Sequence, residues 1–261
     1  MITVLVGESG FVGSTLKKQT SFDFLYRSVN IGSIDYNSFD KLVCAAAPAQ
    51  KWIANQSPQV DLQNIKYLIE HIKSITCGYF ILISTVDVFK DSKGVDEGSL
   101  VTEYGLSPYG LHRRILEKFV EDHFPNHLIV RLPGLVGPGL RKNIIYDFHN
   151  NNNLHAIDCR GVFQFYPMVN LWHDIDIALK SGLKLVHLTA EPMSVSDVAS
   201  HCFAREFTQI LPDSPAHYDF QSKYAGLFGG QSRYQYSKRE ATIAIRAYAQ
   251  SEPLAIKNAK Q

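Results

Sequence analysis

The sequence has little cysteine, a balance of acidic and basic residues, and no long apolar run. Its four cysteines, Cys44, Cys77, Cys159 and Cys202, include no C-x-x-C pair, so we expect neither a disulfide nor a metal site. Lys and Arg total 26 against 25 Asp and Glu, which argues against a nucleic-acid or anionic-membrane partner. No stretch approaches the ~20 apolar residues of a membrane span, and strand residues begin at Ile2, with no room for a signal peptide. We therefore expect a cytoplasmic protein.

One histidine pair could suggest a metal site. His123 and His127 flank Pro125, which would break the helix needed to place both rings on one face. The two histidines are therefore predicted to be exposed in a loop between a helix and a strand.

The chain has 261 residues and 45% hydrophobic content, enough to bury a large core. Strand-like apolar runs alternate with helix-like segments, which predicts an α/β fold with a parallel, doubly wound sheet. The expected strands are 2–6, 22–26, 42–46, 79–84, 128–132 and 185–188, and the expected helices are 13–20, 60–75 and 109–124. Only fifteen residues separate Tyr26 from Leu42, too few for a strand, a crossover helix and their loops. The crossover helix between these two strands is therefore expected to be reduced to a turn near residues 36–40.

Three glycines follow the first apolar run directly. Gly7, Gly10 and Gly13 stand at the spacing G-x-x-G-x-x-G after residues 2–6. Gly7 permits a tight turn, Gly10 lets the backbone approach a pyrophosphate, and Gly13 lets the helix pack close to the strand. The free N–H groups and the dipole of the helix N-terminus attract the anion. The pattern predicts a dinucleotide site, with a plain tight turn as the alternative.

Three further segments match one family together with the glycine loop, which contains Phe11 and Val12. They are Ile-Ser-Thr-Val-Asp-Val-Phe at 83–89, Ser-Pro-Tyr-Gly at 107–110 and Arg-Leu-Pro-Gly-Leu-Val-Gly-Pro-Gly at 131–139. In their order and spacing, these segments resemble the extended short-chain dehydrogenase/reductase family of NAD(P)-dependent epimerases and dehydratases, which act on nucleotide sugars. The resemblance covers about residues 1–200, and the remainder of the chain matches only loosely.

The resemblance implies a Rossmann-type dinucleotide-binding domain over residues 1–140, with a returning segment at about 170–190. It implies a small C-terminal substrate-binding lobe over 141–169 and 191–261. The implied cofactor-binding residues are Gly7, Gly10, Phe11, Val12, Gly13, Arg27, Ala45, Ala46 and Pro133. Many members of the family pair through two helices, so a homodimer through the expected helices 60–75 and 109–124 is the corresponding expectation.

The resemblance places the catalytic groups at Thr85, Tyr109 and Arg113. In the family, a Tyr takes the proton of a sugar hydroxyl as hydride leaves carbon, and Tyr109, which follows Pro108 and opens a helix, fits that position. A free tyrosine has a pKa near ~10, so it needs a nearby positive charge to act as a phenolate. The family has Lys four residues further on, whereas this chain has Arg113, which keeps the charge in a broader, planar group. Thr85 ends a strand and is expected to donate to the sugar carbonyl.

Two other places in the sequence bear on the cofactor and the reaction. An acidic residue after the second strand would bind the ribose 2′-hydroxyl of NAD, but Arg27 stands there and favours the extra phosphate of NADP, with NAD as the alternative. The family's 4,6-dehydratases carry an Asp-Glu pair where this chain has Val86 and Asp87, so elimination of water is not expected. The expected activity is reduction or epimerisation of a nucleotide-activated sugar. The alternative function is that of a non-catalytic NADP-binding sensor that retains the fold.

Overall fold

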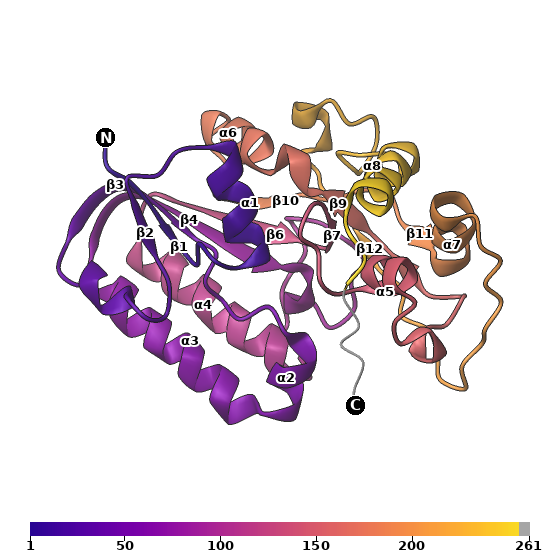
Figure 1. The fold of residues 1–261 in the computed structure, drawn as a ribbon. Coiled ribbons are helices and arrows are strands. Elements are labelled where there is room, and N and C mark those ends of the chain that lie inside the picture. Colours follow the sequence, from indigo (N-terminus) through magenta and orange to yellow (C-terminus); the bar gives the residue numbers. More distant parts are fainter. Residues whose placement is uncertain (256–261) are drawn as a thin grey trace.

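A six-stranded parallel sheet forms the centre of the molecule (Figure 1). The computed structural model describes residues 1–255. The strands follow the order β2-β1-β3-β4-β6-β10, and every neighbouring pair is parallel. Their bounds are Thr3–Val6 for β1, Phe24–Tyr26 for β2, Ser38–Cys44 for β3, Thr76–Thr85 for β4, His127–Leu132 for β6 and Leu185–His187 for β10. The predicted α/β class with a parallel sheet is confirmed.

Helices cover both faces of this sheet, which makes it doubly wound (Figure 1). One face carries α1 (Phe11–Gln19) and α6 (Leu171–Lys180), and the other carries α2 (Lys51–Gln56), α3 (Pro58–Lys73) and α4 (Pro108–His123). Because side chains alternate along a strand, Val4 and Val6 pack toward α3 and α4, while Leu5 packs toward α1 and α6. The central strands therefore bury both of their faces, as is usual for parallel sheets.

Elements mostly from the second half of the chain gather at one end of the sheet (Figure 1). The strand pairs are β7 (Gly134–Val136) with β9 (Phe165–Pro167), β8 (Val162–Phe163) with β11 (Met193–Ser194), and β5 (Lys93–Val95) with β12 (Asp219–Phe220); the helices are α5 (Ile144–Asn150), α7 (Val195–Phe203) and α8 (Lys238–Ser251). Single turns of 3-10 helix lie at Ile31–Ile34, Val86–Val88, Leu154–Ala156, Met168–Asn170 and Ala225–Phe228. Ile145 and Ile245 belong to a separate apolar core formed by these elements. Part of the expected lobe, residues 256–261, lies outside the described residues.

The connection between β2 and β3 is shortened as expected, but its turn lies earlier than predicted. The 3-10 helix Ile31–Ile34 links β2 to β3, and residues 38–40 belong to β3 rather than to a turn. Phe39 is buried, and the Asp40 carboxylate accepts a hydrogen bond from the Ile2 backbone N–H at 2.5 Å. These contacts join segments far apart in sequence, so no local pattern could show that the strand begins at this point.

His127 is buried, contrary to the prediction that it is an exposed loop residue. It begins β6, pairs in register with Phe80, and its Nδ1 lies 2.7 Å from the Phe124 carbonyl oxygen. Pairing with β4 extends the strand one residue beyond its apolar run. Within residues 1–255, no group of three or more His, Cys, Asp or Glu side chains could hold a metal ion. In the same range, no helix has the length and apolar character needed to cross a membrane.

Candidate active site

Four strands of the sheet end at one pocket. β1 ends at Val6, β3 at Cys44, β4 at Thr85 and β6 at Leu132. Because these strands are parallel, their carboxyl ends share one edge, which is where ligands of open α/β sheets bind. A cavity of about 1090 Å³ opens at this edge.

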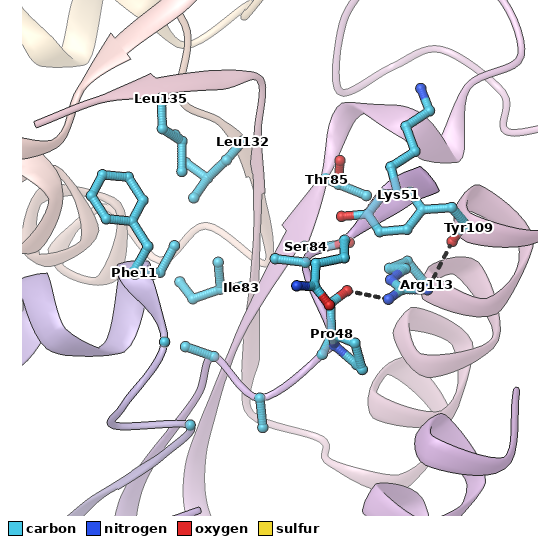
Figure 2. A pocket seen from close by; sticks show the side chains of 18 of the residues that line it. Phe11, Pro48, Lys51, Ile83, Ser84, Thr85, Tyr109, Arg113, Leu132 and Leu135 are labelled. Carbon is cyan, nitrogen blue, oxygen red and sulfur yellow. Dashed lines mark hydrogen bonds between the residues drawn. The ribbon is translucent and has the colours of Figure 1, made fainter. Parts of the chain in front are cut away.

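The pocket brings together all of the predicted catalytic residues, which Figure 2 labels, and all of the predicted cofactor residues except Gly13. Those that line it are Gly7, Gly10, Phe11, Val12, Arg27, Ala45, Ala46, Thr85, Tyr109, Arg113 and Pro133. The sequence motifs therefore converge on a single site although they span about half of the chain.

The glycine loop between β1 and α1 has no room for a side chain at two of its three glycines. Gly7 has a φ of +91°, and a Cβ there would lie 2.5 Å from the Ala45 carbonyl oxygen. A Cβ on Gly13 would lie 2.1 Å from the Gly7 carbonyl oxygen, so Gly13 packs α1 against the loop. At Gly10 the nearest atom to an added Cβ is 3.5 Å away, and α1 has no side-chain cap there. The first N–H groups of α1 are therefore available to an anion.

The pocket carries more positive than negative charge. Among the described residues that line it, four have cationic side chains, Arg27, Lys51, Arg113 and Lys142, against the single carboxylate of Asp87. Arg27 directly follows β2 and is exposed. This balance of charge suits a ligand that carries several phosphate groups.

Tyr109 lies in the first turn of α4, with its ring in the pocket (Figure 2). The Ser107 hydroxyl caps this helix by accepting a hydrogen bond from the Gly110 N–H at 3.3 Å, and Pro108 occupies the first helical position. Both residue types are preferred at these places. The Tyr109 backbone N–H donates to Asn55 Oδ1 at 3.1 Å. Local sequence and one contact from α2 thus fix where the ring enters the pocket.

The hydroxyls of Thr85 and Tyr109 lie together in the pocket (Figure 2). Burial raises the pKa of the Tyr109 phenol above its ordinary value of 10.0. The positive charges of Arg113 and Lys51 and a hydrogen bond with Thr85 lower this pKa, whereas the negative charge of Asp87 raises it further. Because the net direction is upward, Tyr109 is a neutral phenol at neutral pH and is ready to donate a proton.

Arg113 lies against the face of the Tyr109 ring, with its guanidinium carbon 4.0 Å from the ring centroid. Its nitrogens donate to both Asp61 oxygens, one at 3.0 Å, and to the Pro48 carbonyl, as Figure 2 shows for Pro48. Arg113 and Asp61 are both almost fully buried, and His112 also contacts Asp61 at 2.7 Å. The sequence suggested that Arg113 supplies the positive charge beside the phenolate, and the structure pairs this charge with the buried Asp61.

Sequence reasoning missed several polar groups that line or support the site. Lys51 Nζ donates to Asp87 Oδ1 at 2.6 Å and to the Tyr218 hydroxyl at 3.2 Å, and Lys142 Nζ donates to the Ala49 carbonyl. Neither lysine stands in a recognisable motif. Asp61, by contrast, could have been recognised from the sequence. It stands one helical turn before the buried Ile65, so its carboxylate lies on the apolar face of the helix.

Comparison with known proteins bears on the fold. No protein-family model matches the sequence, and a search of curated proteins finds no match. Solved structures do match, and one is a dTDP-4-dehydrorhamnose reductase ortholog from Clostridium acetobutylicum. It is 16% identical with a TM-score of 0.73, and the match covers 96% of this chain and 99% of that one.

Two further solved structures match over a similar range. The dTDP-4-dehydrorhamnose reductase from Bacillus anthracis, in complex with NADP, is 14% identical with a TM-score of 0.71, covering 95% of this chain and 99% of its own. UDP-glucuronic acid 4-epimerase from Bacillus cereus, in complex with UDP-4-deoxy-4-fluoro-glucuronic acid and NAD, is 15% identical with a TM-score of 0.69, covering 96% and 98%. These matches confirm the Rossmann-type fold that the family resemblance implies.

Proposed function

We propose that this protein is an NAD(P)-dependent reductase or epimerase of a nucleotide-activated sugar. One observation carries the proposal: an open glycine loop, two neighbouring hydroxyls on Thr85 and Tyr109, and an excess of cationic side chains meet in one pocket. A dinucleotide and an oxygen-bearing substrate together require such a combination. The reductases and the epimerase that share this fold support the substrate class.

The pocket fits a dinucleotide, and we expect NADP to be preferred. Gly10 leaves open space beside the uncapped start of α1, where a pyrophosphate would bind. Ala45, Ala46 and Pro133 follow β3 and β6 and line the path from there along the sheet edge. Arg27, which directly follows β2 and lines the pocket, is the residue that we expect to bind the 2′-phosphate. NAD is the alternative, since both cofactors occur in the structures that share this fold.

Tyr109 is the proposed general acid/base. When bound, the nicotinamide accepts or supplies the hydride at the reacting carbon of the sugar. Tyr109 exchanges the proton at the oxygen on that carbon, and Thr85 donates a hydrogen bond to the same oxygen when it is a carbonyl. Arg113 contributes a fixed positive charge beside the ring.

The pocket favours reduction or epimerisation over elimination of water. Val86 is buried and has no acidic group, and the Asp87 carboxylate is paired with Lys51 and bonded to Tyr218. Among the described residues that line the pocket, no carboxyl pair is therefore placed to remove water from the sugar. We expect no 4-keto-6-deoxy product from dTDP-glucose or UDP-glucose, which mass spectrometry of the reaction mixture would reveal.

A matched pair of tyrosine variants tests the proposal. Tyr109→Phe should lower turnover of the responsive nucleotide sugar by about 100-fold or more while dinucleotide affinity changes little, because only the proton transfer is lost. Tyr104→Phe is the control, since Tyr104 is 89% exposed and lies outside the pocket. The assay follows NADPH oxidation and product formation over a panel of nucleotide sugars and their keto forms.

The same experiment separates the enzyme from the alternative function. A non-catalytic NADP-binding sensor would bind the dinucleotide tightly, turn over no sugar in the panel and be indifferent to Tyr109→Phe. The pairing of Arg113 with Asp61 is the observation that favours this alternative, because it reduces the positive charge available to a phenolate. Tight binding without turnover would replace the enzyme by the sensor, whereas wild-type rates in Tyr109→Phe would show that Tyr109 is not the general acid/base.

A further inference from the structure

Four cationic side chains line the pocket, but only two of them are paired with a carboxylate. Lys51 and Arg113 each form an ion pair with an acidic side chain. Arg27 and Lys142 form no ion pair with any residue in the described range 1–255. A cation that lines a cavity and has no counter-charge in the protein is available to an anionic ligand.

These two cations lie on opposite sides of the proposed reaction centre. Arg27 directly follows β2, the edge strand beside β1 and its glycine loop. Lys142 follows β6 and β7, and β7 pairs with β9 among the C-terminal elements. Thr85, at the end of β4, stands between them in the order of the strands. A dinucleotide that runs from the glycine loop to Thr85 therefore has Arg27 at its adenosine end and leaves Lys142 on the side of the substrate.

A short series of contacts joins the Lys142 ammonium to Tyr109. Lys142 Nζ donates a hydrogen bond to the Ala49 carbonyl. The carbonyl of the preceding residue, Pro48, accepts a hydrogen bond from Arg113, whose guanidinium carbon lies 4.0 Å from the centroid of the Tyr109 ring. Because consecutive Cα atoms are only about 3.8 Å apart, the ammonium and the guanidinium meet neighbouring carbonyl groups of one segment. Lys142 thus reaches the end of the pocket at which the sugar is proposed to react.

The backbone that carries Lys142 is fixed by the next residue, Asn143. Its Oδ1 caps α5 by accepting hydrogen bonds from the Ile145 N–H at 2.9 Å and the Tyr146 N–H at 3.4 Å, and its Nδ2 donates to the Leu135 carbonyl at 2.9 Å. These bonds hold Asn143 at a φ of +87°, in a region that residues other than glycine rarely adopt. Backbone strain of this kind is common where a chain is positioned for a ligand. The side chain of Lys142 itself is exposed and can adjust to a ligand.

We propose that Lys142 is a specificity-determining residue that binds an anionic group of the nucleotide sugar. The inference rests on the proposed function, which supplies the substrate class. The anionic group is either a phosphate of the nucleotide or a carboxylate of an acidic sugar, since both offer negatively charged oxygens to an ammonium. Of the three N–H donors of the ammonium, the Ala49 carbonyl occupies one. Two donors remain for the ligand, and a charged oxygen is a stronger partner than the neutral carbonyl.

Binding measurements test the proposal without any turnover. Isothermal titration gives the affinities of UDP-glucose, dTDP-glucose, GDP-mannose and UDP-glucuronic acid, and separately that of NADP. Lys142→Met, which keeps the length of the side chain but removes its charge, should weaken binding of the nucleotide sugars by about tenfold or more and leave NADP affinity near the wild-type value. Lys142→Arg should retain most of the affinity. Lys180→Met is the control, because Lys180 is 75% exposed on α6 and lies outside the pocket.

The four nucleotide sugars distinguish the two sources of negative charge. A loss that includes a neutral sugar assigns Lys142 to a phosphate, whereas a loss confined to UDP-glucuronic acid assigns it to the sugar carboxylate. Unchanged affinities in Lys142→Met, an equal loss of NADP affinity, or a wild type that binds none of the four overturn the proposal. Binding that depends on Lys142 without turnover of any sugar would support the anion site while rejecting the proposed function. Turnover that is lost in Tyr109→Phe, with substrate affinity unchanged in Lys142→Met, would do the reverse.

Discussion

Arg113 and Asp61 form a buried ion pair behind the ring of Tyr109, with side chains only 2% and 5% exposed. Removal of one partner leaves an uncompensated charge away from water, which typically costs about 3–5 kcal/mol. Arg113→Met should therefore lower the free energy of unfolding by about that amount. Adding Asp61→Asn should recover a large part of the loss, because the remaining charge is then gone. Denaturant unfolding of both variants measures the difference, and a double variant less stable than Arg113→Met would show that other contacts of Arg113 dominate.

Arg27 is the residue on which cofactor preference depends. A charge-assisted bond from its guanidinium to a 2′-phosphate contributes to NADP binding but not to NAD binding. Arg27→Ala should weaken NADP binding by about 10- to 100-fold and leave NAD binding nearly unchanged. Isothermal titration of each cofactor against wild type and variant provides the measurement. Tighter binding of NAD than of NADP by the wild type, or an unaltered preference in the variant, would contradict this assignment.

At the scale of elements, the glycines at the junction of β1 and α1 meet two different requirements. Gly13 is needed for packing, and Gly10 is needed for access of the ligand. A Cβ on Gly13 would overlap the Gly7 carbonyl oxygen, whereas a Cβ on Gly10 would find its nearest neighbour at 3.5 Å. Gly13→Ala should therefore destabilise the fold by about 1–3 kcal/mol or more. Gly10→Ala should fold normally yet bind the dinucleotide about tenfold or more weakly, because its methyl group lies where a pyrophosphate would approach.

The two alanine variants control for each other. Thermal unfolding without ligand measures the structural cost, and the rise in melting temperature on adding NADP measures binding. If Gly10→Ala loses stability as Gly13→Ala does, the loop is a packing feature alone. If Gly10→Ala is both stable and unaffected in its response to NADP, the dinucleotide does not bind at this loop.

At the scale of the whole molecule, the sequence predicts the parts of the site that follow local patterns. Gly7 comes directly after β1 and Ala45 directly after β3. A sequence pattern that predicts these strands therefore also predicts the pocket residues that follow them. Lys51 and Tyr218 are 167 residues apart and meet only because the fold brings them together. Asp61 is a carboxylate on an apolar helix face and therefore needs a buried partner. The sequence could not identify that partner. The homodimer expected through α3 and α4 stays a prediction.

His187 links the central sheet to the C-terminal elements and makes stability depend on pH. It ends β10, its Nδ1 lies 2.9 Å from the Gln221 carbonyl, and its ring stacks on Phe220 at 4.0 Å between centroids. Burial, followed by the nearby charge of Arg131, holds the pKa of His187 well below its ordinary value of 6.5. His187 therefore binds a proton less readily in the folded state than in the unfolded state. The stability contributed by neutral His187 is fully present above pH 6.5 and is lost as the pH falls toward the folded-state pKa.

His187→Gln should remove this dependence, because glutamine keeps a polar side chain of similar reach but does not titrate. Below pH 6.5, the free energy of unfolding of the wild type should fall relative to the variant by up to about 1.4 kcal/mol per pH unit. Urea unfolding of both proteins at several pH values between neutral and mildly acidic measures this difference. Carboxylates elsewhere in the chain titrate in both proteins, so their effects cancel in the comparison. Parallel pH dependences in the two proteins would mean that His187 takes up its proton as readily in the folded chain as in the unfolded one.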